Sequence, residues 1–299
     1  MKKVRVIMHG RHEQSGKWRK DWQEWREIAP YYLSIVYTQH SGHAIELAFE
    51  AVQQQVDVLI AAGGDGTINE CVNGYLKANG QMPMTFLAMG TGNDFVKSLM
   101  QSGRWRDVHH MIEVNKVDQV DVGWLKFIEL SGAQSQRYFI NVMDIGLGGE
   151  VVQKISKSKR RLGPFLTYQK AVISSLIEYK RNVVKVELDN VSFENDTLML
   201  AIANAKWFGS GLGIAPQALL NDGVFEVIHI GEITLFDYLL QLPKVRRGEI
   251  LQHPSIRYYS SKAIAISTPG IPIDCDGEFI GFTPLDCRIV HNRLNVLVH

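Results

Sequence analysis

A glycine-rich segment that contains an acid is the part of this sequence best suited to chemistry. Ala61–Glu70 reads Ala-Ala-Gly-Gly-Asp-Gly-Thr-Ile-Asn-Glu, between an apolar run and a helical pattern. Glycines here allow positive φ and close approach to a bulky anion, and the helix start offers free N–H groups. Asp65 would repel a phosphate, so we expect it to hold Mg²⁺ or orient a hydroxyl, while Thr67 contacts a phosphate oxygen. A capped strand-to-helix turn is the simpler alternative, but it needs fewer glycines and no acid among them.

A second loop of similar composition follows the next apolar run. Met89–Phe95 reads Met-Gly-Thr-Gly-Asn-Asp-Phe, and in the simpler interpretation Asn93 or Asp94 only caps a helix. Loops at the ends of successive parallel strands meet at one edge of a sheet, where α/β proteins bind ligands. The two loops together therefore predict one anion-binding site more specifically than either loop does alone.

Other nucleotide-binding patterns are absent or incomplete. Five residues separate Gly10 from Gly16, whereas a Walker A motif has four, and Trp18 stands where that motif has Ser or Thr. Gly146-Leu-Gly-Gly149 is a weak match to a dinucleotide motif, and we expect a plain loop there. Without the His-Arg-Asp and Asp-Phe-Gly motifs, a protein kinase is excluded.

The elements that must position these loops change in character along the chain. In the first 120 or so residues strands and helices alternate, which predicts a parallel α/β sheet. The expected strands are Val4–Met8, Leu33–Tyr37, Val56–Ala62 and Met84–Ala88, and the expected helices are Trp18–Ala29, His43–Gln54 and Thr67–Ala78. Beyond about Val117 we expect a mostly antiparallel β domain. Its strands are Val183–Leu188, Thr197–Ala203, Val224–Ile230, Ala263–Ser267 and Leu294–Val298, with one clear helix, Gly163–Tyr179.

Composition is that of an ordinary globular protein. Of the 299 residues, 45% are hydrophobic and 21% charged, and the net charge of +1 gives no global attraction to nucleic acid. No apolar run approaches the ~18 residues of a membrane span, and the apolar stretch after the charged start is too short for a signal peptide. The three cysteines, Cys71, Cys275 and Cys287, are widely spaced, so we expect neither a disulfide framework nor a zinc site. A reducing cytoplasm is the simplest location.

Taken together, the ordered motifs resemble the diacylglycerol kinase catalytic-domain family, in particular its bacterial soluble lipid kinases, with sphingosine and ceramide kinases as more distant relatives. The matching segments are Gly63–Asn69, Gly90–Phe95, Val120–Gly123, Tyr138–Asn141, Gly163–Phe165, Ala215-Pro216, Asn221–Phe225 and Asp276–Glu278. The resemblance implies an α/β ATP-binding domain over 1–120, similar to NAD kinase and phosphofructokinase folds. A β-rich lipid-substrate domain over 121–289 follows, and the segment 290–299 is a candidate to return to the first domain.

The resemblance also assigns the nucleotide-binding residues. They are Thr38, Gly63, Gly64, Asp65, Gly66, Thr67, Ile68, Asn69 and Thr91, together with Ser15, Gly16 and Lys17 of an N-terminal loop. In that loop His12 and Glu13 stand where the family has Asn and Pro, so its shape departs from the family pattern. The phosphoryl donor implied is ATP, with Mg²⁺.

The family's acids carry over to two turns and two further positions. Glu278 matches the proton acceptor, and Asp276 an acid that is also needed, although Asp-Gly-Glu is equally a common hairpin turn. Asp65 and Asp121 match acids that organise Mg²⁺ and water. Asp222, with the backbone carbonyls of Leu219 and Val224, matches a structural Mg²⁺ site, which suits a hard cation. An unmetallated turn is the alternative for this last group.

A basic stretch and an aromatic pair are candidates for contact with lipid. Lys154–Arg161 has five cations in eight residues. It is either a solvated loop or a contact with anionic headgroups, at ~1 kcal/mol per cation, and the family places this loop near the active-site mouth. Trp207-Phe208 is either an apolar tip or part of the core.

We therefore expect an ATP-dependent kinase that phosphorylates a hydroxyl of diacylglycerol or a related lipid at a membrane surface. Two alternatives are a kinase of the same superfold acting on NAD or a soluble polyol, and a nucleotide-sensing regulator that has lost catalysis. The intact Asp65, Asp121, Asp276 and Glu278 argue against the regulator. The sequence leaves the lipid open, and a homodimer is one of the oligomeric states it allows.

Overall fold

Two units make up the chain in the computed structural model, which describes residues 1–157 and 164–299. Unit 1 contains Met1–Val120 and Asn292–His299, and unit 2 contains Asp121–His291. Two strands, β5 (Lys116–Ile128) and β15 (Glu278–Val298), begin in one unit and end in the other.

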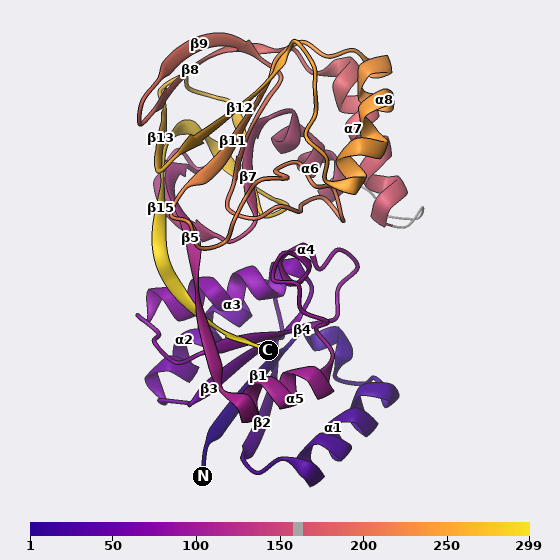
Figure 1. Ribbon diagram of the computed structural model, residues 1–299, viewed down its shortest axis with the longest axis vertical. Helices are drawn as coiled ribbons and strands as arrows, with labels where there is room; N and C mark the ends of the chain where they lie inside the picture. The colour runs from indigo at the N-terminus through magenta and orange to yellow at the C-terminus, as the bar shows by residue number, and fades with distance from the viewer. Residues whose placement is uncertain (158–163) are drawn as a thin grey trace. The chain divides into compact units, whose positions relative to one another are not determined.

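Unit 1 is built on a parallel sheet with strand order β4-β3-β1-β2 (Figure 1). Its strands are β1 (Lys3–Met8), β2 (Tyr32–Tyr37), β3 (Val58–Gly63) and β4 (Met84–Ala88). All six residues of β3 are buried, as expected for a central strand covered on both faces. The end of β15 adds to the outer side of β4 in parallel, with Val296 opposite Met84.

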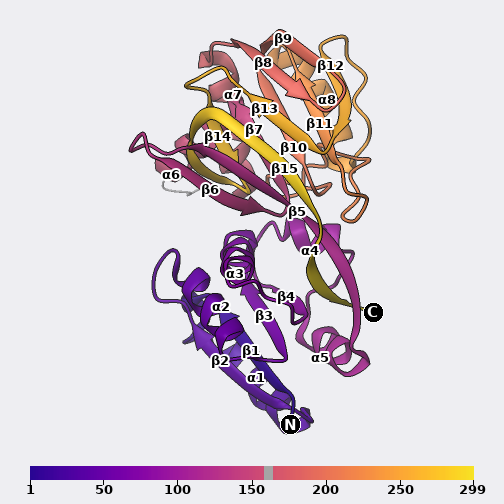
Figure 2. The same ribbon diagram turned by 90° about the vertical axis from the view of Figure 1, so that its left-hand side faces the viewer.

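Helices cover both faces of this sheet (Figure 2). They are α1 (Gly16–Ile28), α2 (His43–Gln53), α3 (Asp65–Lys77), the short α4 (Asp94–Ser98) and α5 (Trp105–Val114), preceded by a 3₁₀ turn at Gly10–His12. α1 and α5 pack on one face, where the rings of Trp22, Trp25 and Trp105 stack in sequence. α2 and α3 pack together on the other face.

Unit 2 is a mixed layer of antiparallel strands and helices. One sheet runs β12-β11-β10-β7-β14, and β15 connects it to a second set in which β15 pairs with β13 and β5, β13 with β8, β8 with β9, and β5 with β6. Besides β5 and β15, the strands are β6 (Gln134–Phe139), β7 (Val142–Gly146), β8 (Asn182–Leu188), β9 (Ser192–Thr197), β10 (Met199–Ala203), β11 (Phe225–Ile230), β12 (Ile256–Ser261), β13 (Ala263–Ile266) and β14 (Pro272–Cys275). The helices are α6 (Leu147–Lys157), α7 (Pro164–Glu178) and α8 (Leu235–Arg247).

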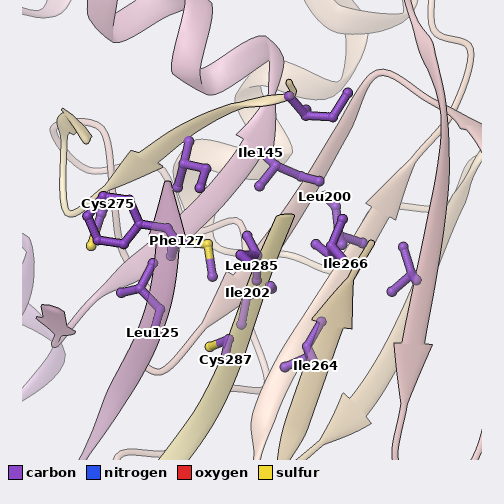
Figure 3. Packing of buried hydrophobic residues seen from close by; sticks show 14 of the residues in the cluster. Leu125, Phe127, Ile145, Leu200, Ile202, Ile264, Ile266, Cys275, Leu285 and Cys287 are labelled. Atoms are coloured by element: carbon purple, nitrogen blue, oxygen red, sulfur yellow. The ribbon is translucent and has the colours of Figure 1, made fainter. Parts of the chain in front are cut away.

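Alternation along the strands of unit 2 produces two separate apolar clusters. Side chains from both sets of strands, including Leu125, Ile202 and Ile264, form the first cluster between them (Figure 3). The opposite face of β7, β10 and β11 packs against α6 and α7 in the second cluster, to which Val151 and Ala201 belong. Burial on both faces agrees with the wholly apolar sequence of β10 and with the burial of every residue of β11, which includes Glu226 and His229.

The predicted fold class, a parallel α/β sheet followed by an antiparallel β-rich region, is confirmed. The plain loop expected over Gly146–Gly149 is wrong, because Leu147 begins α6. Glycines occur there because a Cβ at Gly148 would collide with Asp144, and one at Gly149 would lie 2.7 Å from the backbone of Pro272. In the described ranges, no helix has the length and apolar character needed to cross a membrane.

Candidate functional site

The two glycine loops touch each other in unit 1. Gly64 follows β3 and Gly90 follows β4, and a Cβ at Gly90 would lie 2.5 Å from the Cα of Gly64. The N–H of Met89 donates to the carbonyl of Gly63 at 2.8 Å. Both positions therefore require glycine because the backbones approach too closely for a side chain. The loops form one continuous backbone surface at the carboxyl ends of adjacent parallel strands.

Asp65 joins these loops. Its Oδ1 accepts the N–H of Phe95 at 3.3 Å, at the start of the short helix after the second loop. Burial raises the pKa of the Asp65 carboxyl, against the lowering effect of backbone N–H groups from Asn93 to Phe95. A carboxyl group that is hard to ionise here is well suited to a cation, because a bound cation would favour the charged form.

Among the remaining residues of the first glycine loop, Thr67 is placed where it can contact a ligand, whereas Ile68 and Asn69 pack in the interior. Thr67 lies in the first turn of α3, and a Cβ at Gly63 would lie 2.6 Å from its side chain. The first N–H groups of an α-helix have no partner within the helix, so this turn can bind an anion. Ile68, in contrast, is fully buried in the core, and Asn69 accepts a hydrogen bond from Asn73 at 3.1 Å. Side chains of these two residues therefore fix α3 from inside.

Glu70 is a residue that the sequence analysis missed. Its carboxylate accepts the N–H groups of Gly42 at 3.0 Å and Ala44 at 3.2 Å, at the start of α2. This contact ties the helix of the glycine motif to the loop after β2. The signal was available, because a negative charge is favoured at a helix N-terminus, but the partner lies 28 residues away.

A third loop, after β1, meets the same surface. Thr38 Oγ1 accepts the N–H of Gly10 at 3.0 Å, and the Arg11 guanidinium donates to the carbonyl of Met89 at 3.0 Å. The 3₁₀ turn occupies the place where the family has Asn-Pro, and His9 Nδ1 caps it by accepting the N–H of Arg11. The predicted residues Ser15, Gly16 and Lys17 open α1 just beyond it, and Thr91 lies exposed in the second glycine loop.

Asp276 and Glu278 lie in the turn between β14 and β15 of unit 2. The Asp276 carboxylate accepts the N–H groups of Ile140, Asn141 and Val142 at 2.9, 2.9 and 3.1 Å. Asp276 has φ of 51° and Gly277 has φ of 84°, so the turn uses left-handed backbone at both positions. The carboxylate of Asp276 is therefore directed at backbone, and it holds the turn against the residues that lead into β7.

Glu278 is placed differently. It forms an ion pair with Arg137 of β6, with 2.7 Å between Nη2 and Oε2, and 43% of its side chain is exposed. The pair raises the pKa of the Arg137 guanidinium, against the lowering effect of burial. Arg137 fixes one oxygen of Glu278, and the exposure leaves the carboxylate within reach of a ligand.

Asp121 supports the other predicted turn rather than lining a surface. It is fully buried, and its Oδ2 accepts the N–H of Gly223 while its Oδ1 accepts a hydrogen bond from His291 Nδ1, both at 2.8 Å. Asp222 Oδ1 accepts the N–H of Val224 at 3.2 Å, and Leu219 is exposed in the same loop. His291 is a further residue that sequence reasoning missed, and it orients the Asp121 carboxylate.

A pair of buried acids was also missed. Asp144 of β7 and Asp274 of β14 are directly opposite each other and are 0% and 5% exposed. Burial raises the pKa of Asp144 to about 7, and burial with the neighbouring Asp144 charge raises that of Asp274. Two carboxyl groups this close cannot both ionise without a large cost. Asp274 Oδ1 accepts the N–H of Gly277 at 2.8 Å, so the pair adjoins the Asp276–Glu278 turn.

An apolar pocket lies between the sheet of unit 2 and its helices. It is lined almost entirely by apolar side chains from β10, β11, α6, α7, α8 and the loop after β10, including Leu147, Val151, Tyr168, Val172, Phe208, Leu212, Ile214, Ile230, Tyr238 and Leu242. Phe208 therefore lines this pocket. The neighbouring Trp207 has the ammonium group of Lys206 over its ring.

The predicted basic stretch is described only in part. Lys154 lies on α6 and forms an ion pair with Glu178 at 2.7 Å. Lys159, Arg160 and Arg161 lie outside the described residues, and the side chain of Lys157 does as well.

Comparison with known families divides the chain at a similar place. The diacylglycerol kinase catalytic domain matches residues 3–125. The YegS C-terminal NAD kinase beta sandwich-like domain matches residues 141–298. The first match contains both glycine loops, and the second contains the Asp276–Glu278 turn.

Relatives and solved structures agree with these matches. A diacylglycerol kinase of Staphylococcus carnosus is 31% identical over 277 residues, which is 91% of this chain and 85% of that one. One of Staphylococcus saprophyticus is 30% identical over 86% of this chain and 82% of its own length. A putative diacylglycerol kinase from Bacillus anthracis has the same fold, with a TM-score of 0.76 at 20% identity over 100% of this chain and 97% of that one. This chain therefore belongs to the diacylglycerol kinase catalytic-domain family.

Proposed function

We propose that this protein transfers the γ-phosphoryl group of ATP to a hydroxyl of diacylglycerol or a closely related lipid. Family membership supports an ATP-dependent lipid kinase. The observation that carries the phosphoryl-transfer half is the contact of the two glycine loops, with Asp65 bonded across them. Phosphoryl transfer depends mainly on positioning and charge stabilisation, and these loops supply backbone N–H groups and the carboxyl group of Asp65.

ATP is proposed to bind unit 1 through its phosphates. The backbone of Gly63, Gly64 and Gly66 and the hydroxyl of Thr67 would face them, with Lys17 as a further charge. Thr38 shapes the loop after β1 by its bond to Gly10. Ser15, Gly16, Ile68, Asn69 and Thr91 complete the proposed nucleotide set.

Two acids were assigned to Mg²⁺, and they fit it differently. Asp65 suits a cation because its carboxyl is partly buried and burial raises its pKa, so that a bound cation would favour the charged form. Both oxygens of Asp121 are already bonded, so we propose that it acts indirectly by shaping the Asp222 turn. Carbonyl oxygens of Leu219 and Val224 with the Asp222 carboxylate are the right donor types for a structural Mg²⁺. Bound Mg²⁺ would neutralise phosphate charge.

Unit 2 is proposed to bind the lipid and receive its proton. Glu278 is the proposed general base, because its carboxylate is exposed and Arg137 orients it. Asp276 is a positioning residue, since three backbone N–H groups occupy it. We propose that the apolar pocket holds part of an acyl chain.

The protein is proposed to be cytoplasmic and to meet its substrate at a membrane surface. Lys154–Arg161 is proposed to contribute charge there, and Lys154 is also paired with Glu178.

The test is incubation with γ-labelled ATP and a panel containing diacylglycerol, phosphatidylglycerol, a sphingoid base, NAD and a soluble polyol. We expect label in an organic extract, with diacylglycerol the best acceptor. Label found only in aqueous products would contradict the lipid assignment, and label in NAD would favour the NAD kinase-like alternative. An Asp65→Ala variant is the control for contaminating kinases.

A further inference from the structure

Helix α8 has two apolar faces. The inner face lines the apolar pocket with Tyr238, Gln241, Leu242 and Val245, whose spacing places them on one side of the helix. The outer face has Phe236, Leu239 and Leu240, which are 67%, 50% and 56% exposed. These three residues, called here the outer patch, also share one side because they are three and four positions apart.

Such a helix is unusual on a protein surface. A helix that is apolar on both sides is normally buried, and clustered exposed apolar side chains mark contact sites more often than isolated ones do. Helix α5 of unit 1 shows the ordinary pattern. It buries Val108, Met111 and Ile112 and presents Arg106 and Glu113 on its exposed side. The outer patch of α8 therefore calls for a partner.

Charge at one end of α8 indicates which partner. Its last turn contains Lys244, Arg246 and Arg247, and Arg247 forms an ion pair with Glu249 at 2.5 Å. The acid of the first turn, Asp237, is used in a capping box with Thr234. An apolar patch followed by cations matches an anionic bilayer, in which apolar side chains enter the acyl region and cations face the headgroups.

The size of the outer patch argues against a second protein chain. A specific protein interface buries roughly 800 Å² on each partner, and three side chains on one helix supply only a small part of that. A membrane contact needs no such area, because its strength grows with each inserted apolar group.

We propose that the outer patch of α8 docks on an anionic phospholipid bilayer, so that the pocket behind the helix takes its lipid directly from the membrane. The substrate part of this inference rests on the proposed function, whereas the docking does not. α8 lies beside α7 (Figure 1) and is bonded to it from Tyr238 to Gln169. Pro243 has no N–H to donate to the carbonyl of Leu239, which weakens the helix at its middle.

A single labelled cysteine tests the placement. Cys71, Cys275 and Cys287 are all buried, so a cysteine introduced by Leu240→Cys can be labelled selectively with a polarity-sensitive fluorophore. Vesicles of phosphatidylcholine and phosphatidylglycerol should shift its emission to the blue. The control is Leu130→Cys, at a site 74% exposed in the β5–β6 turn of the same unit, which should not respond. Equal response at both positions, or none at 240, would overturn the proposal.

A triple substitution separates docking from catalysis. Phe236→Ser with Leu239→Ser and Leu240→Ser should weaken vesicle binding at least ten-fold and leave activity on detergent-dispersed short-chain diacylglycerol within two-fold. The matched control changes three exposed apolar residues elsewhere in unit 2, Leu130, Val183 and Val191, to Ser, with no loss of binding expected.

The remaining outcomes are also decisive. Unchanged vesicle binding by the folded triple variant would refute the docking surface, as would loss of a dimer in sedimentation with binding retained. If the wild-type protein binds vesicles through the patch but phosphorylates no lipid, the proposed function fails and the docking surface stands.

Discussion

The two units use backbone N–H groups in opposite ways. In unit 1 the glycine loops precede the start of α3, where the first N–H groups have no partner within the helix and are proposed to bind phosphate. In unit 2 the Asp276 carboxylate takes up three consecutive N–H groups itself. Acids in similar short turns therefore have different tasks. Asp65 is proposed to interact with the charge of a bound ligand. The Asp276 carboxylate instead has backbone N–H groups of the protein as its partners.

The distances along the chain differ as well. Gly63–Thr67 brings its groups together within one turn of helix, whereas Asp276 reaches residues 136 positions away and Glu278 meets Arg137 across 141 positions. Substitutions within a local site should lower activity and leave the stability of the fold nearly unchanged. Substitutions within a site assembled from distant segments should lower stability as well as activity. The following substitutions test this difference.

Asp65→Ala should give the largest effect, abolishing measurable phosphoryl transfer. The physical reason is loss of the carboxyl group that joins the two glycine loops, at a step that depends on charge stabilisation. Stability should change little, because burial raises the pKa of this carboxyl and so opposes its ionised form. Turnover and urea unfolding check both statements. A folded variant with near-normal turnover would remove Asp65 from the proposed site.

Glu278→Gln should lower kcat by ~10²–10⁴-fold, the usual range for loss of a general base. Nucleotide affinity should be unchanged, since Glu278 belongs to unit 2 and the proposed nucleotide residues to unit 1. Single-turnover rates and nucleotide titrations distinguish these effects. Arg137→Lys is the companion variant, because it keeps the charge but changes the geometry of the pair. If Glu278→Gln keeps its rate, the base lies elsewhere.

Asp276→Ala should destabilise the protein by about 1–3 kcal/mol, the range for leaving buried hydrogen-bond donors without an acceptor. The partners left behind are the N–H groups of Ile140, Asn141 and Val142. Asp276→Asn should recover part of the loss, since an amide oxygen still accepts. Urea unfolding measures the change. Wild-type stability combined with lost activity would instead make Asp276 a reacting group like Asp65.

Asp144→Asn should have the smallest effect on activity, and its main consequence should be a changed pH dependence of stability. The folded pKa of Asp144 is about 7 and the unfolded value is near ~3.9, so the folded state holds an extra proton between these values. This contribution is complete below pH ~4 and is lost as pH rises to ~7, at ~1.4 kcal/mol per pH unit. The variant should lose that slope relative to wild type in unfolding measured from pH 4 to 8. Parallel curves of stability against pH for the variant and the wild type would contradict the raised pKa of Asp144.

The same contrast explains which features the sequence could predict. β3, α3 and the contact of Gly64 with Gly90 follow from local patterns and from the rule that adjacent parallel strands end at one edge. The partners of Glu278 and Asp121, which are Arg137 and His291, could not be predicted, because no local pattern encodes pairs so far apart.

Asp144 and Asp274 are an intermediate case. Each interrupts an apolar stretch, as in Val-Met-Asp-Ile and Ile-Pro-Ile-Asp, and a charged residue inside a buried strand is a signal in itself. Sequence alone, however, did not reveal that β7 and β14 pair with these two residues opposite each other. α8 was missed for a related reason, since its two apolar faces give no single amphipathic stripe.

Strand β15 affects the order in which the protein can be made. Its final residues pair with β4, so the outer edge of the first sheet is completed by a segment that is synthesised much later than β4. All of unit 2 is synthesised in between. During translation β4 is therefore an unpaired edge strand, which favours pairing with other chains. Unit 1 cannot complete its sheet before unit 2 has been synthesised. A nascent-chain arrest series should show protease resistance of unit 1 appearing only after the end of β15 is released.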